Sequence, residues 1–147
     1  MRLRILLPVI VAGLASCSDE GPKPSWLVTT ALSANAFSLG EPLVITIVAH
    51  NISSEVRHVN NVCVPQYLVL EAGGHARPLP QRICTALFIL PRDIAPGDSV
   101  VVHDSWDGNV SSGYLKSVPA PPGLYLIEGR VFAPDEVRGS ASQVLLK

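Results

Sequence analysis

Apolar and polar residues alternate along several short segments of this chain, most clearly in EPLVITIVAH, residues 41–50. Every second residue from Leu43 to Ala49 is apolar and shares one face of an extended strand. The alternate residues from Val44 to His50 share the other face, which becomes more polar toward its end. The pattern predicts a β-strand with one buried face.

Four further segments have strand-like composition, and they cover residues 26–33, 98–106, 123–133 and 141–146. Two of them follow turn signals rich in proline and glycine, Ala95-Pro96-Gly97 and Pro121-Pro122. No segment carries a capped run with the helical period. About seven short strands in a chain of this size predict an all-β fold, an antiparallel β-sandwich.

The segment between Cys63 and Cys84 predicts a β-hairpin, because Gly73-Gly74 lies between two strand-like runs. In a two-residue hairpin centred there, the numbers of facing residues add to 147, and the two cysteines meet this condition. Three more pairs would bring like residues together, which cross-strand pairing favours. They are Val64 with Ile83, Gln66 with Gln81, and Leu68 with Leu79.

The hydrogen-bond pattern of this hairpin agrees with a disulfide. If Ala72 and His75 close the turn, Cys63 and Cys84 form a non-hydrogen-bonded pair with Cα atoms about 4.5 Å apart. A disulfide tolerates that separation. Prolines 78 and 80 cannot donate to a strand on their other side, so residues 75–82 are predicted to form an edge strand.

The first 16 residues differ from the rest of the chain. Arg2 and Arg4 precede an apolar run from Ile5 to Ala15, which is shorter than the about 20 residues that span a bilayer. A basic start, a short apolar centre and a small-residue end are typical of a secretory signal. The alternative is a buried N-terminal strand or helix. Export would place the cysteines in an oxidising compartment, where a pair is more often a disulfide than a metal site.

The end of this segment, Leu14-Ala15-Ser16-Cys17, resembles the lipobox of bacterial lipoproteins and matches it at all four positions. The resemblance implies that the Cys17 thiol receives a diacylglycerol. It also implies that the signal, residues 1–16, is cut off and that the new amino group is acylated. Two or three acyl chains hold a protein stably at a membrane. The alternative is an ordinary thiol near a cleaved signal.

Residues 17–25 then form the lipidated cysteine and a short tether, because residues 18–25 are polar and rich in helix breakers. Ser18, rather than an aspartate, follows the cysteine, and the resemblance to Gram-negative lipoproteins then implies the outer membrane in such a host. We therefore expect an exported protein, lipid-anchored to the cell envelope, whose domain, residues 26–147, faces the periplasm or the exterior.

The charge balance and the length of the chain without its signal limit the classes of partner that we expect. Without the signal, nine basic residues face 12 acidic ones in 131 residues, which is one domain's worth. No basic patch stands out, so nucleic acid is not an expected partner. No second long apolar stretch exists, so the membrane is expected to be reached only through Cys17.

Three segments of the predicted sandwich place turn residues before a strand. They are Leu39-Gly40-Glu41-Pro42 leading to Asn51, Ala95-Pro96-Gly97-Asp98-Ser99 leading to Trp106, and Pro122-Gly123-Leu124-Tyr125. Together these segments resemble the BsuPI-type intracellular proteinase inhibitor family. The resemblance implies an immunoglobulin-like sandwich. It places Tyr125 in the tyrosine-corner position, where the hydroxyl binds nearby backbone. Proteinase inhibition by an envelope-anchored protein is one alternative function, although this chain has a cysteine hairpin where that family often has a tryptophan.

No motif for catalysis or cofactor binding is evident. The four histidines, residues 50, 58, 75 and 103, lack zinc-type spacing. Ser99, His103 and Asp104 could be drawn as a triad, but no nucleophile elbow surrounds the serine. Asp107-Gly108-Asn109 lacks the remaining ligand spacing of a calcium loop. We expect no enzyme activity, metal or cofactor, and a hydrolase or metal enzyme stays the less favoured alternative.

The segment from Asp107 to Ala120 is long for a strand connection, and long loops are often functional. Tyr114, Leu115 and Lys116 lie in its polar centre, and aromatic residues are enriched in recognition sites. We therefore predict that this loop contacts a protein partner in the envelope. The alternative is that Tyr114 packs over the end of the sandwich.

Overall fold

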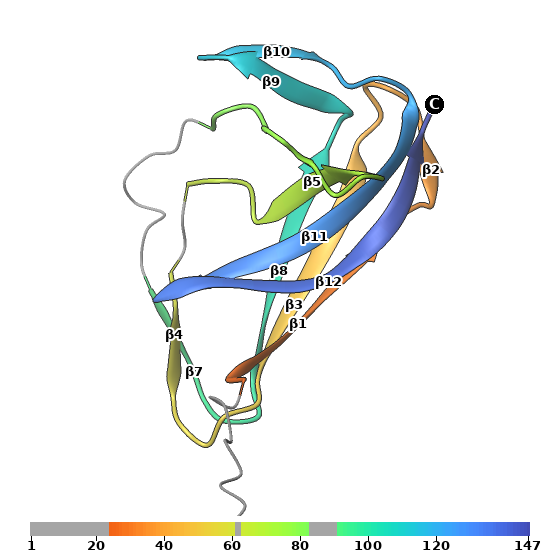
Figure 1. The fold of residues 1–147 in the computed structure, drawn as a ribbon. Coiled ribbons are helices and arrows are strands. Elements are labelled where there is room, and N and C mark those ends of the chain that lie inside the picture. Colours follow the sequence, from red (N-terminus) through yellow and green to blue (C-terminus); the bar gives the residue numbers. More distant parts are fainter. Residues whose placement is uncertain (1–23, 61–62, 83–90) are drawn as a thin grey trace, which may run out of the picture.

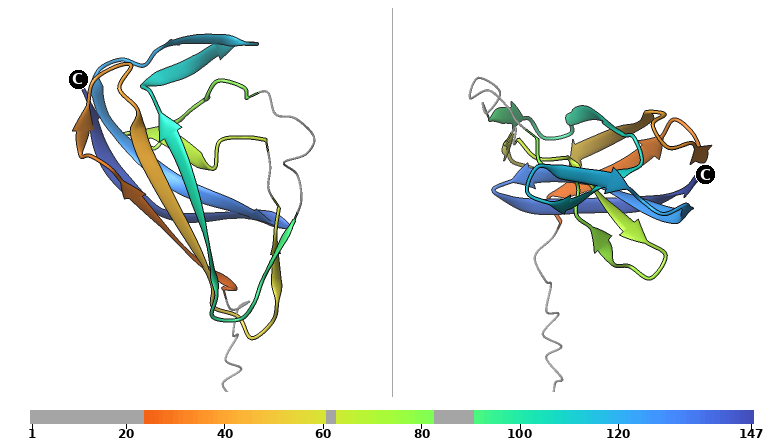
Figure 2. Two further views of the ribbon diagram at one scale, coloured as in Figure 1. Left: turned by 180° about the vertical axis from the view of Figure 1, so that it is seen from behind. Right: turned by 90° about the horizontal axis from the view of Figure 1, so that it is seen from above.

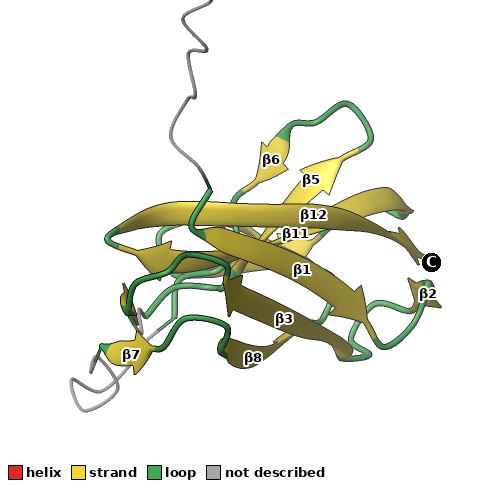
Figure 3. Cartoon of the chain, turned by 90° about the horizontal axis from the view of Figure 1, so that it is seen from below, coloured by secondary structure: helices red, strands yellow, loops and turns green. Residues whose placement is uncertain are grey.

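The computed structural model describes residues 24–60, 63–82 and 91–147. These residues form 12 β-strands and no helix (Figures 1 and 3). Among them no helix could cross a membrane. The all-β prediction is confirmed. The predictions for residues 1–16, for Cys17 and for Cys84 lie outside the described residues.

Two sheets and two ribbons make up the fold. The first sheet has the order β1 (Trp26–Leu32), β3 (Leu43–Asn51), β8 (Ser99–Trp106). The second has the order β2 (Ala36–Phe37), β12 (Asp135–Leu146), β11 (Gly123–Ala133), β5 (Tyr67–Glu71), β6 (Ala76–Arg77). One ribbon pairs β4 (Arg57–Val59) with β7 (Arg92–Ile94), and the other pairs β9 (Asn109–Gly113) with β10 (Lys116–Pro119). The two sheets face each other as a β-sandwich (Figure 2).

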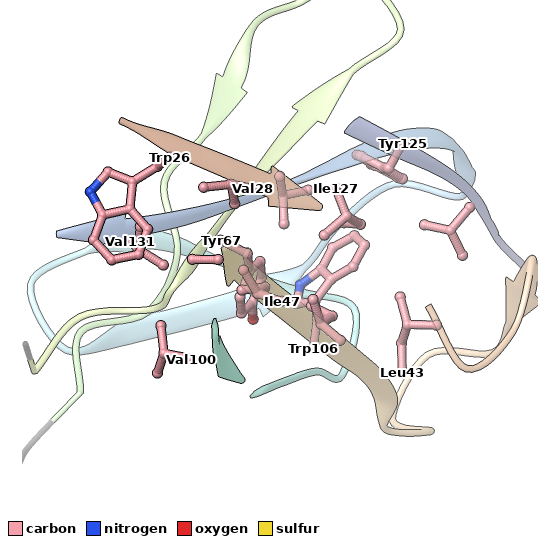
Figure 4. Packing of buried hydrophobic residues seen from close by; sticks show 14 of the residues in the cluster. Trp26, Val28, Leu43, Ile47, Tyr67, Val100, Trp106, Tyr125, Ile127 and Val131 are labelled. Carbon is pink, nitrogen blue, oxygen red and sulfur yellow. The ribbon is translucent and has the colours of Figure 1, made fainter. Parts of the chain in front are cut away.

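The core lies between these sheets and follows the predicted alternation (Figure 4). On β3 the residues from Leu43 to Ala49 that share one face are all almost fully buried, and Val44 on the other face is 42% exposed. Trp106 packs against Phe37 and Tyr125, with ring centroids 5.4 and 5.3 Å away. Aromatic pairs at these separations add to the stabilisation that burial gives.

The sandwich is closed along one side, where β1 of the first sheet meets β12 and β11 of the second. Thr30 of β1 joins the sheets, because its Oγ1 accepts the backbone N–H of Gly129 and its carbonyl oxygen accepts the Ser142 hydroxyl, both at 2.8 Å. A Cβ atom on Gly139 would lie 2.5 Å from the Val28 carbonyl oxygen. Glycine is therefore required there by the close approach of the two backbones.

The predicted hairpin forms, but with a different register. Leu70 pairs with Ala76 and Val69 with Arg77, so the numbers of facing residues add to 146 rather than 147. The reason is Gly74, which has φ +80° and adds a third residue to the turn between Glu71 and His75. The predicted pairing of Leu68 with Leu79 is therefore wrong.

The strand predicted for residues 75–82 is also much shorter. Only Ala76 and Arg77 form β6, which does lie at the edge of its sheet as expected. The carbonyl oxygen of Pro78 instead accepts the backbone N–H of Ser111 at 2.7 Å, from the β9 strand. The last strand, by contrast, is longer than predicted, because β12 begins at Asp135 rather than at residue 141.

Candidate functional site

The segment from Asp107 to Ala120 is an ordered β-hairpin, β9–β10, and not the irregular loop that the sequence predicted. The Trp106 indole Nε1 donates to the Asn109 carbonyl oxygen at 2.8 Å, and the backbone N–H of Ala120 donates to the Gly108 carbonyl oxygen at 2.8 Å. Val110 and Ala120 are buried. The base of the hairpin is therefore fixed to the body of the domain.

The tip of this hairpin presents the residues that the sequence singled out. Tyr114 is 81% exposed and Leu115 is 57% exposed, and Lys116 is exposed beside them. The alternative that Tyr114 packs over the sandwich is wrong. Leu115 has φ +52°, a left-handed conformation that costs a non-glycine residue about 1 kcal/mol or more. Two apolar side chains at a strained, exposed turn make the tip a candidate contact surface.

The hairpin lies at the end of the sandwich opposite to the start of β1 (Figure 1). Trp26 pairs with Asn51 at one end of β3, and Trp106, which precedes the hairpin, pairs with Leu43 at the other end. The nine-residue strand β3 separates them by about 26 Å. Trp26 and the hairpin tip therefore lie at opposite ends of the sandwich.

Cys63 lines a cleft of about 530 Å³ between the β5–β6 hairpin and the segments on either side of it. Its Sγ lies 3.7 Å from the carbonyl oxygen of Arg82. This contact brings Cys63 close to the chain two residues before Cys84, even though the register differs from the predicted one. Because Cys84 lies outside the described residues, the disulfide stays a prediction.

Charges in this cleft are balanced. Arg77 pairs with Glu71, Arg82 with Asp104, and Arg130 with Glu136. Three arginines near one cleft would suggest an anion site, but each already has a carboxylate partner. The cleft therefore offers apolar and proline surface without an uncompensated charge.

The sequence named Asp104 only as a possible triad member, and its buried ion pair with Arg82 was not predicted. Asp104 lies on the face of β8 that points into the sandwich, and its side chain is only 5% exposed. The carboxylate accepts the backbone N–H groups of Gln66 at 3.2 Å and Ser105 at 2.7 Å, besides binding Arg82. A charged residue at an inward-facing position of a strand was the available signal.

Tyr67 lies beside the Asp104–Arg82 ion pair and covers the free edge of β8 at Ser105. Its hydroxyl donates to the Ser105 carbonyl oxygen at 2.9 Å. Burial, with the nearby Asp104 charge, raises the pKa of the Tyr67 phenol well above its ordinary value. Burial lowers the pKa of Arg82, but the Asp104 carboxylate more than offsets this and the net pKa is raised. The Tyr67 phenol therefore stays neutral and the Arg82 guanidinium stays charged.

Ser99, His103 and Asp104 do not form the triad that could be drawn from the sequence. Ser99 Oγ lies 2.9 Å from His50 Nδ1, whereas His103 Nδ1 lies 3.2 Å from the Thr46 hydroxyl. The Ser99, His103 and Asp104 side chains therefore have separate partners. Within the part of the chain that the structure describes, no group of three His, Cys, Asp or Glu residues could hold a metal ion.

Tyr125 has the contact expected of a tyrosine corner. Its hydroxyl donates to the Pro121 carbonyl oxygen, four residues upstream, at 2.7 Å. The ring lies in the core against Trp106. Burial raises the pKa of its phenol. This residue positions the start of β11 and is not part of a binding surface.

Two solved structures share the fold of this domain. A β-glucosidase from Erythrobacter marinus superposes with a TM-score of 0.51 at 14% identity, over 84% of this chain and 15% of that protein. Pseudomonas fluorescens alkylpurine DNA glycosylase AlkC bound to DNA gives a TM-score of 0.51 at 10% identity, over 84% of this chain and 30% of that protein. A mutant β-glucosidase from Listeria innocua in complex with laminaribiose gives a TM-score of 0.47 at 15% identity, over 83% of this chain and 16% of that protein.

This chain is thus a small β-rich domain that matches only a minor part of each of these larger proteins. Identities of this size show the fold alone. No family model and no curated protein matches the sequence.

Proposed function

We propose that this protein is a lipid-anchored, extracytoplasmic binding module of the bacterial envelope, and that the β9–β10 tip contacts a partner protein. The anchor rests on the four matching lipobox residues that end at Cys17. The contact rests on the exposure of Tyr114 and Leu115 at the tip of a hairpin with a fixed base. An aromatic and an aliphatic side chain in an exposed cluster are typical of recognition surfaces.

Geometry links these two parts of the proposal. Residues 18–25 can extend at most about 29 Å, so an anchor at Cys17 would keep the Trp26 end of the sandwich near the membrane. The tip, at the opposite end, would then face away from that membrane. A partner would be reached in the periplasm or outside the cell.

The anchor and the disulfide predict the mass of the protein. Protein extracted from membranes should have the mass of residues 17–147 plus acyl groups, and reduction should add two hydrogen atoms if Cys63 and Cys84 are bonded. Cys17→Ser should abolish the acyl mass, and Cys63→Ser should abolish the gain on reduction. A mass that fits the uncut chain with free thiols would contradict export, and an intracellular inhibitor would become the better proposal.

The contact at the tip predicts position-specific crosslinking. A photoreactive residue at position 114 in whole envelopes should capture a discrete partner. The same residue at Val56, which is 52% exposed but comes from the chain between β3 and β4, should not capture it. Tyr114→Ala with the probe at Leu115 should weaken capture, and Tyr114→Phe should preserve it. Equal capture from positions 114 and 56 would contradict a specific contact.

Proteinase inhibition is a second proposal, because a protruding hairpin with an exposed apolar tip has a form that can enter a substrate cleft. It also agrees with the BsuPI-type resemblance, which implies an immunoglobulin-like domain. A protease captured at position 114, with substrate cleavage slowed by the wild-type protein but not by Tyr114→Ala, would favour this function over other binding roles.

A further inference from the structure

The free edge of β8, the edge that does not pair with β3, is covered at one end and open at the other. Around Asp104 and Ser105 the edge is covered, since Gln66 donates to the Asp104 carboxylate and Tyr67 donates to the Ser105 carbonyl oxygen. From Val100 to His103 the edge borders a slot of about 260 Å³. Val59, Asn60, Gln66 and Arg92 form the other walls of that slot.

The register shows which backbone groups point into this slot. The backbone N–H of Asn51 in β3 donates to the carbonyl oxygen of Asp98, so the backbone of Asp98 faces β3. Backbone groups alternate in direction along a strand, so those of Val100 and Val102 also face β3. The backbone N–H and C=O groups of Val101 and His103 therefore point away from β3. Within residues 24–60, 63–82 and 91–147, no hydrogen bond to these four groups is seen.

An uncovered edge of this kind is unusual. Natural sheets protect their edges with prolines, bulges or charges, because unpaired backbone groups bind extended chains. Prolines 78 and 80 follow β6 at the edge of the other sheet. By contrast, the β8 edge has the sequence SVVVH, with high strand propensity and no proline.

We propose that the β8 edge from Ser99 to His103 binds an extended segment of a partner protein as an added β-strand. The backbone groups of Val101 and His103 would pair with alternate residues of that segment. Its remaining side chains would point into the slot, with apolar residues packing against Val59 and Val100, which are 6% and 4% exposed.

Arg92 gives this ligand its charge preference. Arg92 lines the slot and is exposed, and it takes part in none of the ion pairs between described residues. An acidic residue between two apolar ones on the inward face would reach it. A second copy of β8 fits less well, because its only acidic residue, Asp104, already binds Arg82 and two copies would bring two Arg92 side chains together.

The test uses a defined probe, the fluorescein-labelled peptide TVTETVT, and membrane-extracted full-length protein labelled with ¹⁵N in detergent. The inference does not depend on the hairpin tip, so Tyr114→Ala should bind the peptide as the wild type does. We expect saturable binding, with the largest amide shifts at Val101 and His103. The peptide with N-methyl groups on its third and fifth residues should bind at least about tenfold more weakly, because it cannot donate to the edge.

Val101→Pro should also weaken binding at least about tenfold, while leaving the β3 ladder intact because this N–H is not used there. Val101→Thr is the matched control and should bind normally. If the proline variant does not fold, Arg92→Glu decides instead, because it should reverse the preference from TVTETVT to TVTKTVT.

Four results would overturn the proposal. The first is equal peptide binding by Val101→Pro and the wild type, and the second is no binding at millimolar peptide. The third is protection of the Val101 and His103 amides from exchange in the free monomer, and the fourth is a dimer that Val101→Pro dissociates. The last result would make a second copy the occupant.

Discussion

Trp106→Ala should lower the free energy of unfolding by about 3–5 kcal/mol, because it removes a large buried side chain and leaves a cavity. Trp106 is 2% exposed and touches the rings of Phe37 and Tyr125, which come from the other sheet. The loss is large compared with the about 5–15 kcal/mol that stabilises a typical domain. We expect a lower urea midpoint with an unchanged slope, unless the variant no longer unfolds in two states.

The measurement is urea unfolding of the full chain, followed by the fluorescence of Trp26, the tryptophan that remains, and by circular dichroism. Trp106→Phe is the control. It keeps an aromatic ring in the core but loses the hydrogen bond from the indole to the Asn109 carbonyl oxygen, so it should cost less. A loss under about 1 kcal/mol for Trp106→Ala would contradict the central position of this residue in the core.

Asn51→Asp should lower the free energy of unfolding by about 2–4 kcal/mol at pH 7. Asn51 is fully buried, and its Nδ2 donates to the carbonyl oxygens of Glu55 at 2.8 Å and Ile94 at 3.0 Å. Its Oδ1 accepts the backbone N–H and the hydroxyl of Ser53, at 3.0 and 2.7 Å. An aspartate keeps the shape but replaces both donors with an oxygen that faces two carbonyl oxygens.

The stability that Asn51→Asp loses should increase as the pH rises. Burial among carbonyl oxygens should raise the pKa of the new carboxyl in the folded state above its unfolded value of about 3.9. The folded variant then binds more protons than the unfolded one between the two values, so its stability falls as pH rises. Relative to wild type, the loss should be smallest below about pH 4 and should increase toward pH 7.

Asn35→Asp is the matched control, because Asn35 is exposed in the turn before β2. The same chemical change there should cost little and should show little dependence on pH. Urea midpoints of both variants and the wild type between pH 3.5 and 7 give the comparison. An Asn51→Asp loss that is equal at both ends of this range would show that the new carboxyl is solvated, contrary to the structure.

Asn51 also shows how far the sequence reaches into the core. The alternation from Leu43 to Ala49 continues to residue 51, so the sequence contains the signal that a polar side chain lies on the buried face. It contains no sign of the carbonyl oxygens that satisfy that side chain, because Glu55 and Ile94 belong to a turn and a ribbon whose positions depend on the whole fold.

The β9–β10 hairpin and the β5–β6 turn show where local patterns were insufficient. Residues 107–120 look like a loop in sequence because most of them are polar residues, glycine or proline and no regular alternation runs through them. They pair as strands because Trp106, Val110 and Ala120 fix the base against the sandwich. Gly73-Gly74 correctly marked a turn, but two glycines permit either a two-residue or a three-residue connection, and the sequence pattern cannot choose between them.

The sequence by itself determined the all-β class and the buried face of β3, because alternation and turn residues depend only on near neighbours in the chain. The tyrosine-corner position of Tyr125 was implied by the family resemblance. Only the tertiary structure decided which strand edges stay open and which polar side chains meet. The slot beside β8, the Asp104–Arg82 pair and the partners of Asn51 each join segments that are distant in sequence. Contacts of that kind follow from how the sheets pack, and no local pattern contains them.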